Sequence, residues 1–386
     1  MRRSRTLVLY WETGRLVLEN YLTRKRRLVG PGIVNVLDQA GRWQSRRSLL
    51  SKFPREDLAQ IRRAIDTLIT GSFLQTTNKR RAADRQLVAS WDTWHPAASF
   101  FHFATKNAPF PTNEKGHEEV EKNLQARMSK RPSAVKRYRG LPTVALPSPE
   151  TAGEFPQVLL RRRTWRQFGS LPLDLQSLST LLALSFGVQW KVRLDVVGTV
   201  SLTTSPSGGA RHPLETYLIV QRVSGLASGL YHYQSDTHRL TRLSKPARRE
   251  IVSCFPGQSW CAKVPVIVFL TAVFRRTQWK YPDPQAYRVL LAEAGHVCQT
   301  FCLASTWLGL APYCTMALAD SIIEKNLGID GISESILYAA GVGRRPKARR
   351  WAPWPDREEL PMPKATGVFA KKDLPPLKAI RRGSGS

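Results

Sequence analysis

The pattern of hydrophobic and polar residues changes from alternating to helical within the first part of the chain. β-Branched and aromatic residues alternate with polar ones and predict strands at Thr6–Trp11 and Arg15–Thr23. Three short stretches with apolar residues at helical spacing follow, and the last is Asp57–Ile69. Strands followed by three helices predict a small winged-helix-like module over residues 1–80.

Residues 81–155 have a different composition from the segments on either side and are predicted to form a connector. Aromatic residues cluster between Trp91 and Phe103, and Lys106–Pro149 is polar, charged and interrupted by proline. Such a segment lacks the apolar residues for a core of its own, so we expect it to cross a surface rather than to form a domain.

From residue 156 onward the pattern predicts a layered α+β domain that extends to residue 348. Val264–Ala272 is a nearly continuous apolar run of strand length, which is typical of a central strand covered on both faces. The other predicted strands are Thr216–Arg222, Gly229–Tyr233 and Ser335–Val342. The predicted helices are Leu175–Phe186 and Pro284–Leu308. Strands between long helices predict an α+β or α/β layer fold.

The charge of the chain is unevenly distributed. Hydrophobic residues make up 42% and charged residues 23%, which excludes a wholly disordered chain. Of the net charge of +30, residues 1–150 carry +15 and residues 341–386 carry +8. Most of the positive charge therefore lies outside the central fold, and we attribute it to the binding of partners or to tails. We expect residues 349–386 to be a basic tail, ending in a Gly-Ser-Gly-Ser typical of an expression scar.

Several features predict a cytoplasmic protein without a membrane span. The five cysteines form no C-x-x-C pair and are odd in number, which argues against a disulfide framework. Glu12 and Arg15 interrupt the apolar start, so no signal peptide is expected. The charge-free stretch Ala294–Ala319 contains polar residues and a proline, which favour a buried helix and its exit turn over a membrane span.

The sequence predicts no metal site. His296 lies three residues after Glu293 on the predicted buried helix, and the two are expected to form a polar pair in the core. Cys298 and Cys302 lie on one face of that helix and are interpreted as small core residues. No third and fourth ligand follows at zinc spacing.

Three clusters carry candidate chemistry. Residues 161–168 (RRRTWRQF) bring four guanidinium groups near a hydroxyl, which suits a phosphate, although a solvated basic surface is the alternative. Residues 204–213 (TSPSGGARHP) let backbone N–H groups approach a ligand, although a surface turn would look similar. Residues 341–347 (GVGRRPK) carry a strand into cationic residues, or else begin a basic tail.

Taken in order, these clusters resemble the flavin-dependent nitroreductase superfamily. Within it they resemble the SagB-type peptide dehydrogenases, which include the azoline oxidases of thiazole and oxazole peptide biosynthesis. The matching segments span residues 156–348 and are RRTWRQF, PLDLQSLSTLL, SPSGGARHPLETYLIV, GLYHY, the Lys-Tyr of RRTQWKYPDPQAYRVLLAEAGHVCQ, and ILYAAGVGRRP. The stretch WDTWHPAASFFHFATK also resembles the segment that precedes this domain in the family.

The resemblance implies FMN as cofactor and a homodimer with FMN at the subunit interface. It implies that phosphate and ribityl contacts come from Arg162, Arg163, Thr164 and Arg166, with Arg344 meeting the phosphate from another side. It implies that the isoalloxazine is lined by Pro206, Ser207, Gly208 and Gly209. Thr203 stands where the family often has a basic residue, and a loop at Ala311–Thr315 would offer backbone donors.

Lys280 and Tyr281 distinguish an azoline oxidase from a generic flavin reductase. Aromatising a thiazoline or oxazoline removes a proton from a ring carbon while a hydride leaves to the flavin. A lysine whose pKa is lowered by burial and nearby cations, beside a tyrosine, can act as the base. The resemblance implies this role for the pair, whereas the alternative is that Lys280 caps a surface loop.

The predicted function is therefore FMN-dependent oxidation of azoline rings in a ribosomally made precursor peptide. A cyclodehydratase is a candidate partner, and the basic N-terminal module would suit an acidic leader peptide. Two other classes stay open: a flavin oxidoreductase of a small molecule or another peptide site, and a basic nucleic-acid-binding protein. Nucleic-acid binding is disfavoured because it leaves the flavin motifs unexplained.

Overall fold

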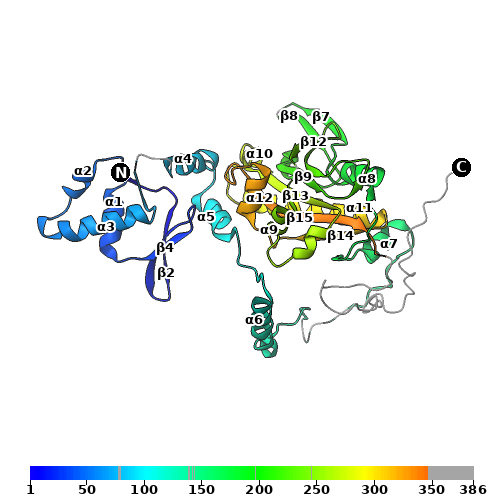
Figure 1. Ribbon diagram of the computed structural model, residues 1–386, viewed down its shortest axis with the longest axis horizontal. Helices are drawn as coiled ribbons and strands as arrows, with labels where there is room; N and C mark the ends of the chain where they lie inside the picture. The colour runs from blue at the N-terminus through cyan, green and yellow to red at the C-terminus, as the bar shows by residue number, and fades with distance from the viewer. Residues whose placement is uncertain are drawn as a thin grey trace. The chain divides into compact units, whose positions relative to one another are not determined.

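The computed structural model describes residues 1–76, 80–137, 140, 142, 144–195, 197–244 and 246–346 (Figure 1). The chain divides into two compact units. Unit 1 comprises Met1–Lys106, Val273–Val289 and Asp330–Ser335, and unit 2 comprises the rest. The domain boundaries expected at residues 80, 155 and 348 stay predictions, and the expected tail over 349–386 lies outside the described residues.

Unit 1 begins with strands and continues with helices, as the sequence predicts. Its elements are β1 (Arg2–Arg3), β2 (Leu7–Glu12), β3 (Arg15–Asn20), β4 (Lys25–Leu28), α1 (Pro31–Gln39), α2 (Arg46–Leu50), α3 (Leu58–Thr70) and β5 (Leu74–Gln75). β2, β3 and β4 form an antiparallel sheet in that order, and β1 pairs with β5. Leu18, Ile65 and Leu68 are fully buried in the core of this part. Whether this fold is winged-helix-like stays a prediction.

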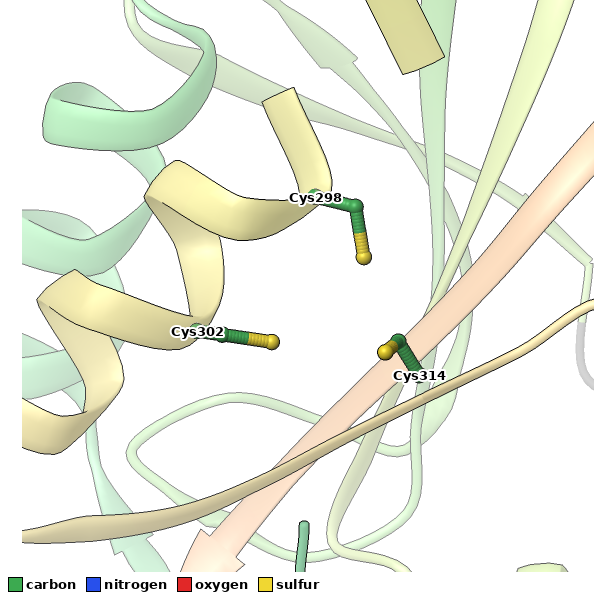
Figure 2. Close-up of side chains that lie close together, drawn as sticks. All are labelled: Cys298, Cys302 and Cys314. Atoms are coloured by element: carbon green, nitrogen blue, oxygen red, sulfur yellow. The ribbon is translucent and has the colours of Figure 1, made fainter. Parts of the chain in front are cut away.

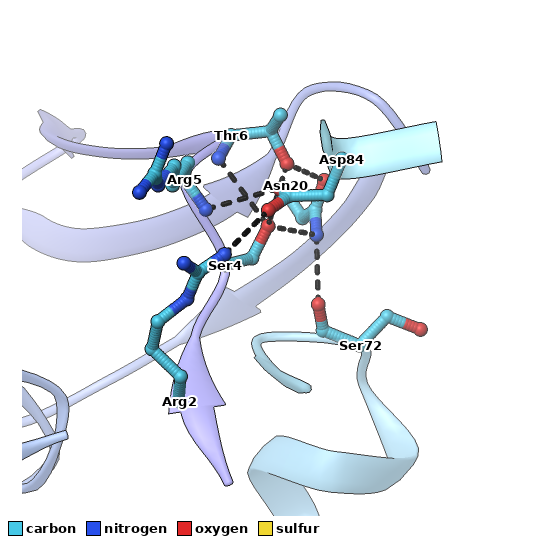
Figure 3. A network of polar contacts seen from close by, with 7 residues as sticks. All are labelled: Arg2, Ser4, Arg5, Thr6, Asn20, Ser72 and Asp84. Atoms are coloured by element: carbon cyan, nitrogen blue, oxygen red, sulfur yellow. Dashed lines mark hydrogen bonds and ion pairs between the residues drawn. The ribbon is translucent and has the colours of Figure 1, made fainter. Parts of the chain in front are cut away.

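A buried polar network surrounds Asp84 on α4 (Arg80–Ser90) in unit 1 (Figure 3). The Asp84 carboxylate accepts hydrogen bonds from the Ser4 hydroxyl at 2.8 Å and the Arg5 amide at 3.0 Å. Its other oxygen lies 3.2 Å from the Arg2 guanidinium. Because Asp84 is only 1% exposed, these donors offset the cost of burying its charge and fix the start of the chain against α4.

Aromatic side chains join the three stretches of unit 1. They come from the segments around α5 (Pro96–Thr105) and α10 (Phe274–Gln278). The Trp91 ring lies 4.7 Å from the Phe274 ring, and the Trp91 indole donates to the carbonyl of Ile332 at 2.9 Å. The buried His102 Nδ1 lies 2.8 Å from the Tyr287 hydroxyl. Unit 1 is therefore one compact body made from three separate pieces of chain.

Unit 2 is built on a six-stranded sheet. The strand order is β12 (Arg239–Ser244), β11 (Gly229–Gln234), β9 (Leu214–Val220), β13 (Val266–Val273), β15 (Glu334–Arg344) and β14 (Leu310–Thr315). β9 pairs antiparallel with both β11 and β13, and β14 pairs antiparallel with β15. The central strand predicted at Val264–Ala272 is confirmed as β13.

Helices cover both faces of this sheet (Figure 1). On β13, Val268 and Leu270 pack in one core cluster with side chains of α8 (Leu175–Phe186) and α11 (Ala286–Trp307). Ile267 and Phe269 pack in a second cluster with side chains of α9 (Arg248–Ser253) and α12 (Asp320–Leu327). Alternate side chains of one strand thus pack into two separate cores, one on each face of the sheet. The predicted α+β fold of mixed helices and sheet is confirmed.

One predicted element is wrong. The segment expected to be a loop at Ala311–Thr315 is most of the edge strand β14, in which Pro312 pairs with Val342 of β15. An edge strand tolerates proline because it needs hydrogen-bond donors on one side only. The remaining elements are α6 (Glu114–Gln125), α7 (Glu154–Arg161), β6 (Leu173–Asp174), β7 (Trp190–Leu194), β8 (Gly198–Leu202) and β10 (Val223–Ser224), with four short 3-10 turns. Within the described residues, no helix has the length and apolar character needed to cross a membrane.

Candidate functional site

A cluster of arginines follows α7 in unit 2. Arg161 ends the helix, and Arg162, Arg163 and Arg166 come within the next five residues. The Arg163 guanidinium donates to the backbone carbonyls of Leu160 at 2.9 Å and of Arg162 at 2.8 Å. Burial, and then the charge of Arg162, lowers the pKa of Arg163, and burial lowers the pKa of Arg166 as well. Cations crowded into a half-buried space favour an anion beside them.

A buried donor in this cluster has no partner. The Nε atom of Arg161 is buried and makes no hydrogen bond to any described residue. Arg345, at the end of β15, lies with its guanidinium carbon 5.8 Å from the centre of the Trp165 ring. Burial, and then the charge of Arg161, lowers the pKa of Arg345. Arg345 therefore belongs to the same cationic cluster, although the sequence prediction did not select it.

Arg344 points elsewhere. Its Nε donates to the Pro172 carbonyl at 2.8 Å, and its guanidinium lies 3.5 Å from the Asp174 carboxylate. Arg345 is the first residue after β15, and its guanidinium, not that of Arg344, lies against the Trp165 ring. The phosphate contact of Arg344 stays a prediction.

Two glycines allow the arginine segment to lie directly against β15. The Gly169 amide donates to the Arg344 carbonyl at 2.8 Å. A β-carbon on Gly343 would come within 2.8 Å of the Phe168 ring and 2.7 Å of the Pro265 ring, closer than real contacts allow. The RRTWRQF and GVGRR motifs, which are far apart in sequence, are therefore neighbours.

The small-residue loop at 204–213 is anchored on α11. The Ser205 hydroxyl lies 2.7 Å from the Thr300 hydroxyl. The Ser207 hydroxyl donates to the Glu293 carboxylate at 3.0 Å, and the Gly208 amide donates to the same oxygen at 3.2 Å. The Ser207 hydroxyl also accepts from the His212 amide at 2.9 Å. The loop is thus held in one shape rather than left as a free surface turn.

The backbone of this loop is strained. Gly209, Ala210 and His212 have φ angles of +64°, +54° and +44°. Only glycine adopts such angles without steric cost, so Ala210 and His212 persist there because the surrounding contacts impose them. Strain of this kind tends to concentrate at ligand sites.

Glu293 is a site residue that the sequence prediction placed wrongly. It is 4% exposed, and burial raises its pKa, whereas the hydrogen bonds from Ser207 and Gly208 act in the opposite direction. His296, the partner expected from the sequence, is exposed. The Glu293 carboxylate instead accepts from Ser207 of the loop. The two residues are 86 positions apart in the sequence, so helical spacing alone could not reveal this contact.

Helix α11 supports both parts of the site. Glu293 and Thr300 hold the loop, while the Thr306 carbonyl lies 3.5 Å from the Arg345 guanidinium. Glu293 and Thr306 are separated by about 20 Å along the helix axis at 1.5 Å per residue. The strained loop and the cations therefore lie at different levels along one helix, which suits a long ligand with an anionic end.

Lys280 and Tyr281 lie next to each other after α10. The Lys280 Nζ is 5.7 Å from the centre of the Tyr281 ring. Both backbone amides donate to the Thr277 carbonyl, and the Trp94 indole donates to the Tyr281 carbonyl at 2.9 Å. The pair is half-buried and belongs to unit 1, whereas the arginines and the loop belong to unit 2.

Comparison with known proteins identifies the fold around these residues. Residues 159–344 match the Nitroreductase family. The protein named nitroreductase MJ1384 of Methanocaldococcus jannaschii is 34% identical over 189 residues, which cover 49% of this chain and 89% of that protein. The chain belongs to the nitroreductase family. It is a flavin-dependent oxidoreductase with FMN as cofactor, as predicted.

Two further proteins are similar to parts of this nitroreductase-family chain. The trifolitoxin-processing protein TfxB of Rhizobium leguminosarum bv. trifolii is 32% identical over 179 residues. The match covers 45% of this chain and 48% of TfxB, so the chain spans about half of that relative. A chain of the E. coli microcin synthetase McbBCD complex with truncated pro-MccB17 bound aligns with a TM-score of 0.48 and 20% identity. That alignment covers 67% of this chain and 97% of the other.

The residues of this structure fit FMN. Its phosphate is an anion, and the Arg161 Nε atom is a buried donor that lacks a partner among the described residues. Burial lowers the pKa of Arg163, Arg166 and Arg345 around it, so a negative charge there would be stabilising. The strained loop supplies small side chains, which let a planar ring approach its backbone closely. The donor set therefore suits a flavin mononucleotide.

Proposed function

We propose that this protein is an FMN-dependent dehydrogenase that oxidises thiazoline or oxazoline rings in a precursor peptide to thiazoles or oxazoles. The observation that carries the proposal is the Lys280–Tyr281 pair, with Nζ 5.7 Å from the phenol ring. An amine beside a phenol, both half-buried, suits removal of a proton from carbon, which a simple flavin reductase does not need.

Within the proposal, the chain holds FMN at two places. Arg162, Arg163, Thr164 and Arg166 would bind the phosphate and ribityl groups, with Arg344 as a further phosphate contact. The loop of Pro206, Ser207, Gly208 and Gly209 would line the isoalloxazine. The anchoring of this loop by Glu293 supports its part, because a fixed surface costs less ordering when a planar ring binds.

The chemistry divides between cofactor and chain. Bound FMN supplies an acceptor for the hydride that leaves the azoline ring. Lys280 would take the proton from the neighbouring ring carbon at Nζ. Tyr281 would orient that amine, and the Trp94 indole fixes the backbone of the pair through the Tyr281 carbonyl. Two hydrogens thus leave the ring together, one as hydride and one as proton.

The proposed substrate is a peptide, and its leader would bind to the basic N-terminal half. The relative TfxB is named a processing protein for trifolitoxin, which supports a peptide substrate. Residues 1–150 carry +15, and Lys25, Arg26 and Arg27 on β4 are all exposed. Such a surface attracts an acidic leader peptide, and the binding of that peptide should weaken as the salt concentration rises. A homodimer, and a complex with a cyclodehydratase, are part of the same proposal.

The test uses a synthetic peptide that already contains thiazoline or oxazoline rings. The protein is loaded with FMN and incubated with it, and mass spectrometry follows the peptide. We expect the peptide to lose two hydrogen atoms for each ring. Without oxygen, the reaction should stop once all of the bound flavin has been reduced. If the flavin can be reduced but the peptide is unchanged, the protein is a flavin oxidoreductase that acts on some other substrate.

A second measurement addresses nucleic acid as the alternative partner. Binding of random duplex DNA is compared with binding of an acidic leader peptide at physiological salt. We expect the leader to bind more tightly. Tight DNA binding with a steep salt dependence would favour the alternative class instead.

A further inference from the structure

Three cysteine side chains of unit 2 converge in one place (Figure 2). Cys298 and Cys302 lie one helical turn apart on the same face of α11, and Cys314 approaches from β14. The three Sγ atoms all lie within 4.8 Å of one another. Figure 2 shows the three sulfurs directed into the same space between helix and strand.

The convergence goes beyond ordinary packing of small side chains. Cys298 and Cys302 are 2% and 3% exposed, and Cys314 is half-buried. The other two cysteines, Cys254 and Cys261, are equally buried but lie in the core cluster on the opposite sheet face. Cys254 there donates to the Glu250 carbonyl at 3.1 Å, as a structural thiol does. Three of the five thiols instead face one another.

The donor set selects the kind of ligand. Three sulfur atoms, without a carboxylate or imidazole, are soft ligands that prefer thiophilic ions. Tetrahedral zinc has Zn–S bonds of about 2.3 Å, which place ligand sulfurs about 3.8 Å apart. Sulfurs already within 4.8 Å need only a small closure to reach that spacing.

Charge balance favours a divalent ion over a monovalent one. Three thiolates and a divalent ion carry one negative charge, and Arg162 interacts electrostatically with Cys302 and Cys314. A monovalent ion would leave two negative charges against that single arginine, which is costly in a buried place.

We propose that Cys298, Cys302 and Cys314 form a binding site for one thiophilic divalent ion, Zn²⁺, which ties β14 to α11. Three protein ligands leave a fourth position on the half-buried Cys314 side, which is also the route of entry. The ion would fix the edge strand whose Pro312 carbonyl accepts from the Trp165 amide at 2.8 Å. It would thereby support the arginine segment from behind. The site does not rest on the proposed function.

The test measures zinc in the FMN-loaded full chain. The protein is reduced, freed of metal with a chelator and titrated with Zn²⁺ against a chromophoric chelator. We expect one Zn²⁺ per chain in the wild type. Loss of the direct ligand in Cys314→Ser should lower the affinity by more than the roughly 10–100-fold that removal of an outer-shell partner costs. Cys254→Ser, which removes a buried thiol outside the cluster, should keep the wild-type affinity.

A measurement on the wild type keeps the proposal testable if Cys314→Ser does not fold. Cysteine alkylation is mapped by peptide mass spectrometry with and without Zn²⁺, and Co²⁺ replaces Zn²⁺ for absorption at wavelengths beyond those of oxidised flavin. We expect Zn²⁺ to protect Cys298, Cys302 and Cys314 together, and Co²⁺ to give a thiolate-ligand spectrum. A reduced chain that binds no stoichiometric zinc, equal binding by Cys314→Ser, or a disulfide within the trio that persists under reduction would each overturn the proposal.

Discussion

The Glu293 carboxylate accepts a hydrogen bond from the Ser207 hydroxyl at 3.0 Å. The same oxygen accepts from the Gly208 amide, so one buried acid on α11 fixes two residues of the loop proposed to line the flavin. A buried carboxylate used in this way is a positioning group, since its charge is met by loop donors rather than by an arginine. This one side chain therefore holds two neighbouring residues of the loop.

Replacing Glu293 should therefore weaken FMN binding without removing any proposed FMN contact. In Glu293→Ala both loop donors lose a charged acceptor, and hydrogen bonds to charged groups contribute about 1.5–3 kcal/mol each. We expect the Kd for FMN, measured by flavin fluorescence, to rise roughly tenfold or more. Glu293→Gln should lose less, because the amide oxygen still accepts. Glu119→Ala on the exposed face of α6 is the control and should bind FMN normally. Normal binding by Glu293→Ala would mean that the loop holds its shape without this acid.

Arg166→Ala should lose flavin first and activity only as a consequence. Burial lowers the pKa of Arg166, so its charge is held in a poorly solvated place where an anion gains most from it. We expect the Kd for FMN to rise roughly 10–100-fold, and saturating FMN to restore much of the turnover. Arg239→Ala on β12 removes an equal charge from an exposed position and serves as the control. If both variants bound FMN alike, the arginine cluster would not be the phosphate site.

Lys280→Ala should show the reverse behaviour. It removes the proposed base but no proposed cofactor contact, so FMN occupancy should stay and azoline oxidation should fall roughly 10²–10⁴-fold. Tyr281→Phe should cost less if the phenol only orients the amine. The matched control is Lys263→Ala, an exposed lysine outside the proposed site. Near-normal oxidation by Lys280→Ala would show that the pair is structural.

The stability of unit 1 should decrease in acid because of His102. Burial, and then the charge of Lys106, lowers the pKa of His102 to about 3 in the folded chain. Unfolded histidine has a pKa of about 6.5, so below that pH the unfolded chain binds a proton that the folded chain does not. The free energy of unfolding should be unaffected by His102 above about pH 6.5 and should fall by about 1.4 kcal/mol per pH unit toward pH 3. Denaturant unfolding at several pH values checks this, and His102→Asn should have a shallower slope.

Local sequence signals predicted much of the fold. α8 was predicted at its observed bounds, Leu175–Phe186, because its amphipathic pattern starts after Pro172 and stops at Gly187. In the structure Asp174 caps its start by accepting from the Ser177 amide. β13 was evident because a strand buried on both faces needs an unbroken apolar run. β4 was not predicted, since its sequence, Lys-Arg-Arg-Leu, is exposed throughout and has no alternation to detect.

The site was harder to predict because its contacts join distant segments. The arginine segment and the small-residue loop were selected from their residue types and from the order of the motifs. In the structure the loop contacts Glu293 and Thr300 of α11, and the arginine segment lies against β15. The partnership of Glu293 with Ser207 spans 86 positions, and that of Cys314 with the α11 thiols depends on β14 being a strand. Arg345 was missed because its contact with Trp165 joins two segments that are far apart in the sequence. These features follow from tertiary pairing, which one sequence does not contain.

The division of unit 1 into three stretches has a consequence for transplanting this part into another enzyme. Residues 1–106 cannot be grafted or deleted as an independent cassette, because Phe274 and Tyr287 in the middle of the chain complete their aromatic core. Deleting them would expose those two rings at the segment that carries Lys280. Any chimaera that borrows the N-terminal part must also carry Val273–Val289 and Asp330–Ser335, so a recombination breakpoint at residue 106 is expected to yield an insoluble product.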